Sequence, residues 1–298
     1  MLSSEQLKNR KLGIGGSDAA AIAGMSKFKT ALDVYIDKTS TEEKEQSKSE
    51  VLYWGNALED PILLRYEEET GNVVTKYTEN FKHKDHDFML GNIDGFVKDK
   101  NILIEAKTSR FNLGWGDEWS ADIPQEYLLQ VAHYMSILDV EEAHIPVLFS
   151  GSDFKIFKYI RDKKIEKNLI DIESNFWYNN VRKLEPPKPV NLEDVRKRFR
   201  VSTGAEITVD NEVHDSITTM KSIKSKIKEL KGIQDGLKFG IMDFMGEHST
   251  LVNFDGSKAA TWNDRKNKRF NLESFKEKHK NLYDEFSVES SSRTFLIK

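Results

Sequence analysis

Two short apolar segments, residues 89–97 (MLGNIDGFV) and 102–107 (ILIEAK), are separated by four polar residues, which is typical of a β-hairpin. If the middle two linker residues form the loop, residues whose numbers add to 199 face each other, so Asp94 lies opposite Glu105. Because side chains alternate along a strand, Lys107 shares the face of Glu105. The pattern therefore predicts that two carboxylates and an ammonium group meet on one face of the hairpin.

This convergence of charges has two interpretations. Opposed like charges destabilise a strand pair, but a divalent cation between the carboxylates reverses the sign, and carboxylate oxygens suit Mg²⁺. Such an ion can activate water and stabilise charge on a phosphate. Alternatively, Glu105 and Lys107 form an ordinary salt bridge, because Glu-x-Lys also occurs at Glu42 and Glu229. Only Glu105 lies in an aliphatic run, where an unpaired carboxylate is costly; the spacing alone leaves both interpretations open.

Composition limits the classes of function. The 298 residues include 45 Lys and Arg against 49 Asp and Glu, for a net charge of −4, so any DNA contact needs local basic patches. The absence of cysteine excludes disulfides, thiolate metal sites, iron–sulfur clusters and a cysteine nucleophile. No apolar leader segment and no run of about 18 apolar residues occurs. We therefore expect a protein of a reducing compartment, the cytoplasm, with no membrane partner.

The chain is predicted to have two parts. Three of its six prolines lie within residues 185–189, which marks a boundary and predicts a core of residues 1–190 and a C-terminal extension of residues 191–298. Helical periodicity over residues 211–248 predicts a long helical segment, followed by a β-hairpin and a short helix within residues 250–298. Glycines spaced four residues apart in the helical segment predict a break or a close helix contact.

Three further features flank the hairpin. Arg10 precedes residues 15–18 (GGSD), where the glycines and Ser17 could hold an anion at a helix start, although a plain capped helix is the commoner explanation. Glu59 lies in GNALEDP and could face the same cation as Asp94, or simply face solvent. Tyr127 and Gln130 share one face of a helix expected over residues 122–138, which otherwise is an amphipathic core helix.

The densest basic run, residues 196–200 (RKRFR), contains Arg196 and Arg198. These side chains could contact DNA phosphates without reading base sequence. The alternative is an ordinary solvated surface.

Five motifs in this order resemble those of the lambda exonuclease and YqaJ-type viral recombinase branch of the PD-(D/E)XK nucleases. The resemblance covers about residues 10–150 and depends on Arg10 with Gly15, Gly16, Ser17 and Asp18; Gly55, Glu59 and Pro61; Asp94 and Gly95; Glu105, Ala106 and Lys107; and Tyr127 and Gln130. One departure is Ile93, which stands where the proline of the family name precedes the aspartate.

The resemblance implies an α/β (α+β) restriction-endonuclease-like core, with a mixed central sheet flanked by helices. It implies that Asp94, Glu105 and the backbone carbonyl of Ala106 hold a catalytic metal and that Glu59 supports a second one. The ions would be Mg²⁺, with Mn²⁺ as an alternative. Lys107 would then be the catalytic lysine.

The resemblance implies roles for other residues as well. Gln130 would lie near the attacking water, with Tyr127 beside it. Arg10 and Ser17 would bind a 5′ phosphate at the end of the pocket.

The implied activity is 5′-to-3′ digestion of one strand of linear double-stranded DNA, which leaves 3′ single-stranded tails. The implied partners are double-stranded DNA ends and a single-strand annealing protein of the RecT-like or Bet-like kind, and relatives form ring trimers. The implied setting is a bacterial host cell, with a phage or prophage origin. Alternatives are a structure-specific or restriction-type endonuclease with the same metal site, and a non-catalytic DNA-binding recombination scaffold.

Overall fold

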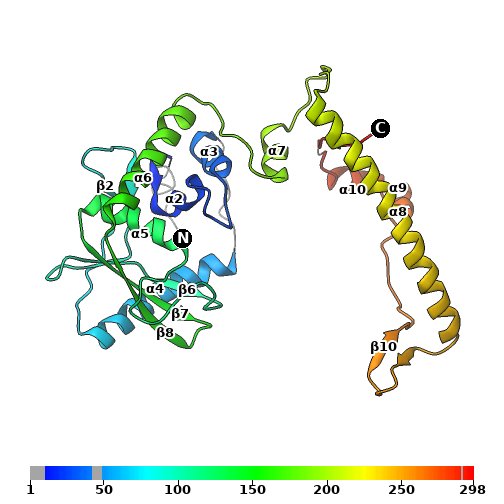
Figure 1. Ribbon diagram of the computed structural model, residues 1–298, viewed down its shortest axis with the longest axis horizontal. Helices are drawn as coiled ribbons and strands as arrows, with labels where there is room; N and C mark the ends of the chain where they lie inside the picture. Colours follow the sequence, from blue (N-terminus) through cyan, green and yellow to red (C-terminus); the bar gives the residue numbers. More distant parts are fainter. Residues whose placement is uncertain (1–10, 42–48, 290) are drawn as a thin grey trace. The chain divides into compact units, whose positions relative to one another are not determined.

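The computed structural model describes residues 11–41, 49–289 and 291–298, and the chain forms two compact units, Met1–Arg198 and Phe199–Lys298. Figure 1 shows the elements of each unit. The first unit contains, in chain order, β1 (Ile14–Gly15), α2 (Gly16–Ile22), α3 (Ala31–Thr39), α4 (Glu50–Thr70), β2 (Phe81–Lys82), β3 (Met89–Gly91), β4 (Gly95–Val97), β5 (Ile102–Ile104), β6 (Lys107–Ser109), α5 (Gln125–Leu138), β7 (Glu142–Phe149), β8 (Asp153–Ile160), α6 (Lys163–Asn175), the π-helix η1 (Phe176–Val181) and α7 (Leu192–Arg198).

A mixed five-stranded sheet forms the centre of this unit. β5 and β6 pair with β7 in parallel, whereas β8 pairs with β7 and β4 pairs with β5 in antiparallel fashion. A smaller sheet has the order β1-β3-β2. The predicted class, a mixed sheet flanked by helices, is confirmed.

Helices cover both faces of the main sheet. Side chains that alternate along β5 pack against the helices on each face. Leu103 packs in a core that includes Met135 of α5, while Ile104 packs with Tyr66 of α4 on the other face. Because the period of a strand is two residues, the side chain of Glu105 belongs on the α5 side with Leu103. The sheet therefore directs the candidate carboxylate towards α5.

The hairpin register is confirmed, since Gly95 lies opposite Ile104 and Val97 opposite Ile102. The connection is longer than the predicted two-residue loop, because pairing stops at Val97 and Ile102 and residues 98–101 form the turn. Asn101 has a φ of 56°, a left-handed conformation that asparagine tolerates better than most residues.

The predicted continuity of the two strands is wrong. Residues 89–97 are divided between β3 and β4, which belong to different sheets. Residues 102–107 are interrupted after Ile104, although β5 and β6 keep the same offset along β7. At the interruption, the backbone N–H of Ala106 donates to Oδ2 of Asp94 at 2.9 Å. A side-chain carboxylate thus takes the place of a strand carbonyl.

The second unit contains a 35-residue helix, α8 (Asn211–Met245), followed by the antiparallel strands β9 (Thr250–Val252) and β10 (Lys258–Thr261), then α9 (Leu272–Lys278) and α10 (Lys280–Glu285). The carboxylate of Asp210 begins α8 by accepting the N–H of Val213 at 2.8 Å. The glycines of α8 cause neither the expected break nor a close contact: the helix is continuous, and no atom of a described residue lies within 4 Å of a Cβ built at Gly232, Gly236 or Gly240. No helix in the described ranges is long and apolar enough to cross a membrane.

Two glycine substitutions test this packing. A Cβ at Gly95 would lie 2.4 Å from Cγ1 of Val74, so we expect Gly95→Ala to lower the free energy of unfolding by about 1–3 kcal/mol. Gly236→Ala, in open space, should instead stabilise the helix by about 0.5–1 kcal/mol. Urea denaturation followed by circular dichroism measures both. Equal effects at the two positions would contradict the close approach at Gly95.

Candidate active site

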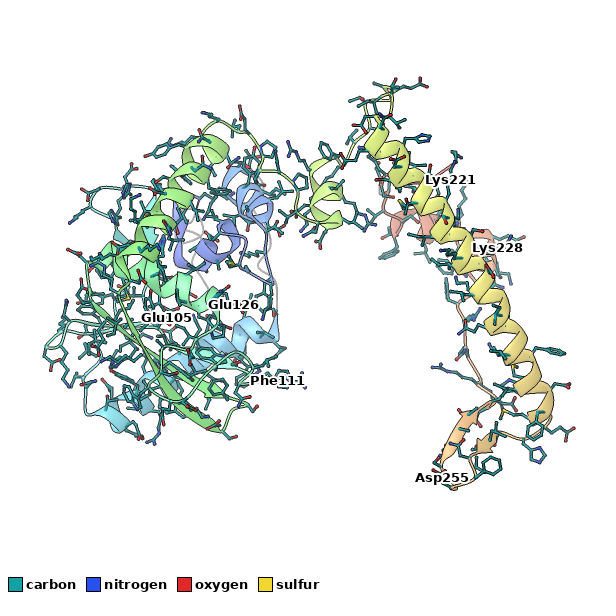
Figure 2. All side chains as sticks on the ribbon, viewed as in Figure 1. Glu105, Phe111, Glu126, Lys221, Lys228 and Asp255 are labelled. Atoms are coloured by element: carbon teal, nitrogen blue, oxygen red, sulfur yellow. The ribbon has the colours of Figure 1, made fainter. Side chains whose placement is uncertain are left out.

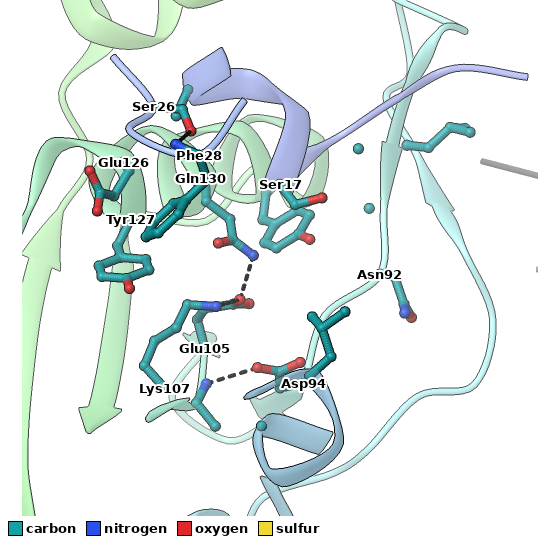
Figure 3. A pocket seen from close by; sticks show the side chains of 18 of the residues that line it. Ser17, Ser26, Phe28, Asn92, Asp94, Glu105, Lys107, Glu126, Tyr127 and Gln130 are labelled. Atoms are coloured by element: carbon teal, nitrogen blue, oxygen red, sulfur yellow. Dashed lines mark hydrogen bonds and ion pairs between the residues drawn. The ribbon is translucent and has the colours of Figure 1, made fainter. Parts of the chain in front are cut away.

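One cavity of the first unit, with a volume of about 810 Å³, brings together most of the predicted site residues. It lies where α2, α4 and α5 meet the ends of β4, β5 and β6 (Figure 3). The residues that were predicted from sequence and line it are Ser17, Glu59, Asp94, Glu105, Ala106, Lys107, Tyr127 and Gln130.

Glu105 is the most buried acid of this cavity, at 2% exposure. Its Oε1 accepts from Nζ of Lys107 at 2.5 Å and from Nε2 of Gln130 at 2.6 Å. Its Oε2 is buried and has no hydrogen-bond partner within the described part of the chain. A buried carboxylate oxygen without a partner is unfavourable, so this atom favours a ligand that the protein itself does not supply. Figure 3 shows the hydrogen bond from Gln130 to the Glu105 carboxylate.

Asp94, which directly precedes β4, lines the same cavity as Glu105. Burial, followed by the charge of Glu105, raises the pKa of the Asp94 carboxyl well above its ordinary value, and Lys107 opposes this only in part. Burial also raises the pKa of Glu105, again with Lys107 acting in the opposite direction. The hairpin register therefore holds two carboxylates together at a cost in free energy.

Lys107 stays an ammonium in this setting. Burial lowers its pKa, but the charges of Glu105 and Asp94 outweigh burial, and the net pKa is raised. Its Nζ also lies 5.6 Å from the ring centroid of Tyr127. A lysine held in the charged form can donate hydrogen bonds and neutralise negative charge, and is poorly suited to act as a base.

Glu59 enters the cavity from α4, because the whole GNALEDP motif lies inside that helix, with Pro61 in its interior. Its side chain is 29% exposed and pairs with Nζ of Lys76 at 2.8 Å. The Glu59 charge contributes to the raised pKa of Asp94, although less than burial and Glu105 do. Glu59 is thus near the carboxylate pair but already has a cationic partner.

The fit of these residues to a divalent metal can be judged from their donor atoms. Across the described residues, no group of three or more histidines and acids is arranged to hold a metal ion. The fit therefore depends on the carboxylates of Asp94 and Glu105, and on Oε2 of Glu105, for which the described residues provide no hydrogen-bond partner. Mg²⁺ commonly uses one or two carboxylates and keeps several waters. The pair fits such an ion, with Glu59 and the carbonyl of Ala106 as further oxygen donors along the same cavity.

The face of α5 that the spacing predicts is the face that lines the cavity, with Tyr127, Gln130 and Tyr134 on it. Tyr127 stacks on Trp115 with ring centroids 5.3 Å apart. Tyr134 was not among the candidate site residues, although it shares this face. A Cβ at Gly16 would lie 2.6 Å from the Tyr134 ring, so a glycine is needed for α2 to approach α5.

The GGSD motif also brings an ion pair that sequence reasoning missed. α2 begins at Gly16, and Ser17 is exposed on the cavity wall. Asp18 is buried and pairs with Nζ of Lys38 at 2.6 Å, both side chains being only 4% exposed. Lys38 also lines the cavity. No local pattern indicates this lysine, since it lies 20 residues away on α3. Arg10 lies outside the described residues.

Arg196 and Arg198 do not line the cavity. They lie on α7, where Nη1 of Arg198 donates to the carbonyl of Pro187 at 3.0 Å and Arg196 is exposed. Their neighbour Lys197 pairs with Asp33 of α3 at 2.7 Å. Part of the basic run therefore attaches α7 to the core.

The cost of the carboxylate pair gives a direct test. In chelator, we expect Asp94→Asn to raise the melting temperature, because the side chain loses its charge but can still accept the N–H of Ala106. Mg²⁺ at about 100 times its Kd should stabilise the unmodified protein by about 2.7 kcal/mol and the variant far less. Thermal unfolding with and without Mg²⁺ measures both effects. Asp117→Asn, at an exposed aspartate, is the control; an equal Mg²⁺ response in all three proteins would contradict the site.

Comparisons with known proteins bear on the family and the fold. The family model of the YqaJ-like viral recombinase domain matches residues 5–141. The chain is 29% identical over 309 residues to the uncharacterized protein YqaJ of Bacillus subtilis (strain 168), covering 100% of this chain and 95% of that protein. The crystal structure of an alkaline exonuclease (LHK-Exo) from Laribacter hongkongensis has a similar fold, with a TM-score of 0.51 and 18% identity over 61% of this chain and 96% of that one. The match over residues 5–141 is to the same family that the sequence motifs resemble.

Proposed function

We propose that this protein is a divalent-metal-dependent deoxyribonuclease that digests one strand of linear double-stranded DNA from its 5′ end. The observation that carries the proposal is the pair Asp94 and Glu105 beside the Lys107 ammonium in an open cavity, where Oε2 of the buried Glu105 has no hydrogen-bond partner among the described residues. The similar fold of a protein named as an alkaline exonuclease supports the exonuclease assignment.

In this proposal, Asp94 and Glu105 hold the metal, and Glu59 contributes to a second ion. The bound ion supplies Lewis-acid chemistry, lowering the pKa of water and stabilising charge on phosphate. Gln130 and Lys107 orient Glu105 through the hydrogen bonds to Oε1. Water adds to the phosphorus and the bond to the 3′ oxygen of the terminal nucleotide breaks, with the proton going to that oxygen.

Lys107 neutralises the charge that develops on the phosphate during this step, because the two carboxylates keep it protonated. Tyr127 lies beside it and would border the path of the DNA strand. Ser17, on the cavity wall, would contact the 5′ phosphate together with Arg10. Arg196 and Arg198, away from the cavity, would contact duplex phosphates.

The 3′ tails left by such digestion are the substrate of a single-strand annealing protein. We therefore include such a protein among the proposed partners. A ring of three subunits would keep the enzyme on one DNA end and belongs to the same proposal.

The test is digestion of end-labelled linear duplex in Mg²⁺, with closed and nicked circles alongside. We expect loss of the 5′ label first and intact closed circles. Glu105→Gln and Lys107→Ala should each lower the rate by about 100-fold or more, while Asp117→Asn should not change it. Mg²⁺-dependent digestion retained by both site variants would refute the assignment, and cutting of closed circles would indicate an endonuclease.

A further inference from the structure

An apolar stripe runs along α8, in the second unit, and remains exposed there. Its residues alternate at spacings of three and four, with a single polar member, Gln234. The seven apolar side chains are between 46% and 79% exposed: Met220, Ile223, Ile227, Leu230, Leu237, Ile241 and Phe244. This is the a/d pattern of a coiled coil, sustained over about 25 residues, or roughly 36 Å of helix. We call these eight residues the seam.

Lysines border the seam. Met220, Ile227, Gln234 and Ile241 are the a positions of the seam. The e positions are then occupied by three lysines, Lys224, Lys231 and Lys238, and Lys226 occupies a g position. None of the four forms an ion pair with another described residue. In a coiled coil, e and g side chains face the partner helix and determine its charge. The flanks of the seam therefore present unpaired positive charge.

The lysine charges beside the seam limit which kind of partner can bind there. Two copies of α8 would place Lys226 against Lys231 in a parallel pair, or the e-position lysines against each other in an antiparallel pair, and like charges oppose both. Duplex DNA could meet the lysines but would leave the aliphatic side chains uncovered, because phosphate and sugar offer no apolar ridge.

We propose that the seam binds an amphipathic helix of a partner protein that carries Glu or Asp at the positions flanking its own apolar stripe. A polar residue of the partner would lie opposite Gln234 and set the register, as a single polar a residue does in coiled coils. The seam belongs to the second unit, and the cavity lined by Asp94 and Glu105 belongs to the first. The proposal therefore does not depend on nuclease activity.

The test uses two synthetic four-heptad peptides with Ile and Leu at a and d, one with Glu at e and g and the other with Lys there. Fluorescence anisotropy measures their binding to the full chain. We expect the acidic peptide to bind roughly tenfold more tightly or better than the basic one. Reversing two seam-flanking charges, Lys224→Glu with Lys231→Glu, should abolish or invert this preference.

Figure 2 shows the matched control positions, Lys221 and Lys228, on the same helix. They are b positions, farther from the seam, so Lys221→Glu with Lys228→Glu changes the charge equally and should alter affinity by less than about twofold. Circular dichroism confirms that both double variants keep α8 helical.

Four results would overturn the proposal. Equal losses in the two double variants would indicate only long-range attraction, and binding of neither peptide would show that the seam takes no such helix. A wild-type dimer in sedimentation that the basic-to-acidic changes strengthen would assign the seam to a second copy. Displacement of the acidic peptide by a short DNA duplex, with equal sensitivity to both double variants, would assign the lysines to nucleic acid.

Discussion

The repulsion between Asp94 and Glu105 is the interaction on which the candidate site depends. Asp94 directly precedes β4 and Glu105 directly follows β5, so the paired register of these strands places the two carboxylates at the same end of the hairpin. One oxygen of Glu105 accepts hydrogen bonds from Lys107 and Gln130, while the other is buried and has no hydrogen-bond partner among the residues that the structure describes. The pKa values of both carboxyls are raised, with a single ammonium beside them, so a divalent cation between them would lower the cost of ionising both.

The surrounding fold keeps this charge in place. The single break between β5 and β6 frees the N–H of Ala106 for Asp94, and the parallel pairing of both strands with β7 maintains the direction of Glu105 and Lys107. α5 covers that face of the sheet and supplies Gln130. Hydrogen bonds and packing thus keep the two carboxylates close together despite their repulsion, as in other preorganised sites.

The proximity of Asp94, Glu105 and Lys107 could be predicted from the sequence because side chains alternate between the two faces of a strand. The register of the hairpin follows from turn position alone, and the face of α5 follows from helical spacing. The strand interruptions could not be predicted, since they depend on a side chain replacing a backbone acceptor. The Asp18 and Lys38 pair was also hidden, because it joins two helices that only the tertiary fold brings together.

The second unit shows a different limit of sequence reasoning. The helical period of α8 was clear, but its glycines suggested a break that the structure lacks, because each faces open space. Weak helix propensity was outweighed by the length of the helix and its Asp210 cap. The exposed seam on α8 could be recognised only once burial was known.

The most direct test of the metal site is anomalous diffraction from crystals soaked in Mn²⁺. We expect a peak between Asp94 and Oε2 of Glu105 that disappears in Glu105→Gln. An absence of density between the two carboxylates at saturating Mn²⁺, with both side chains ordered, would contradict it.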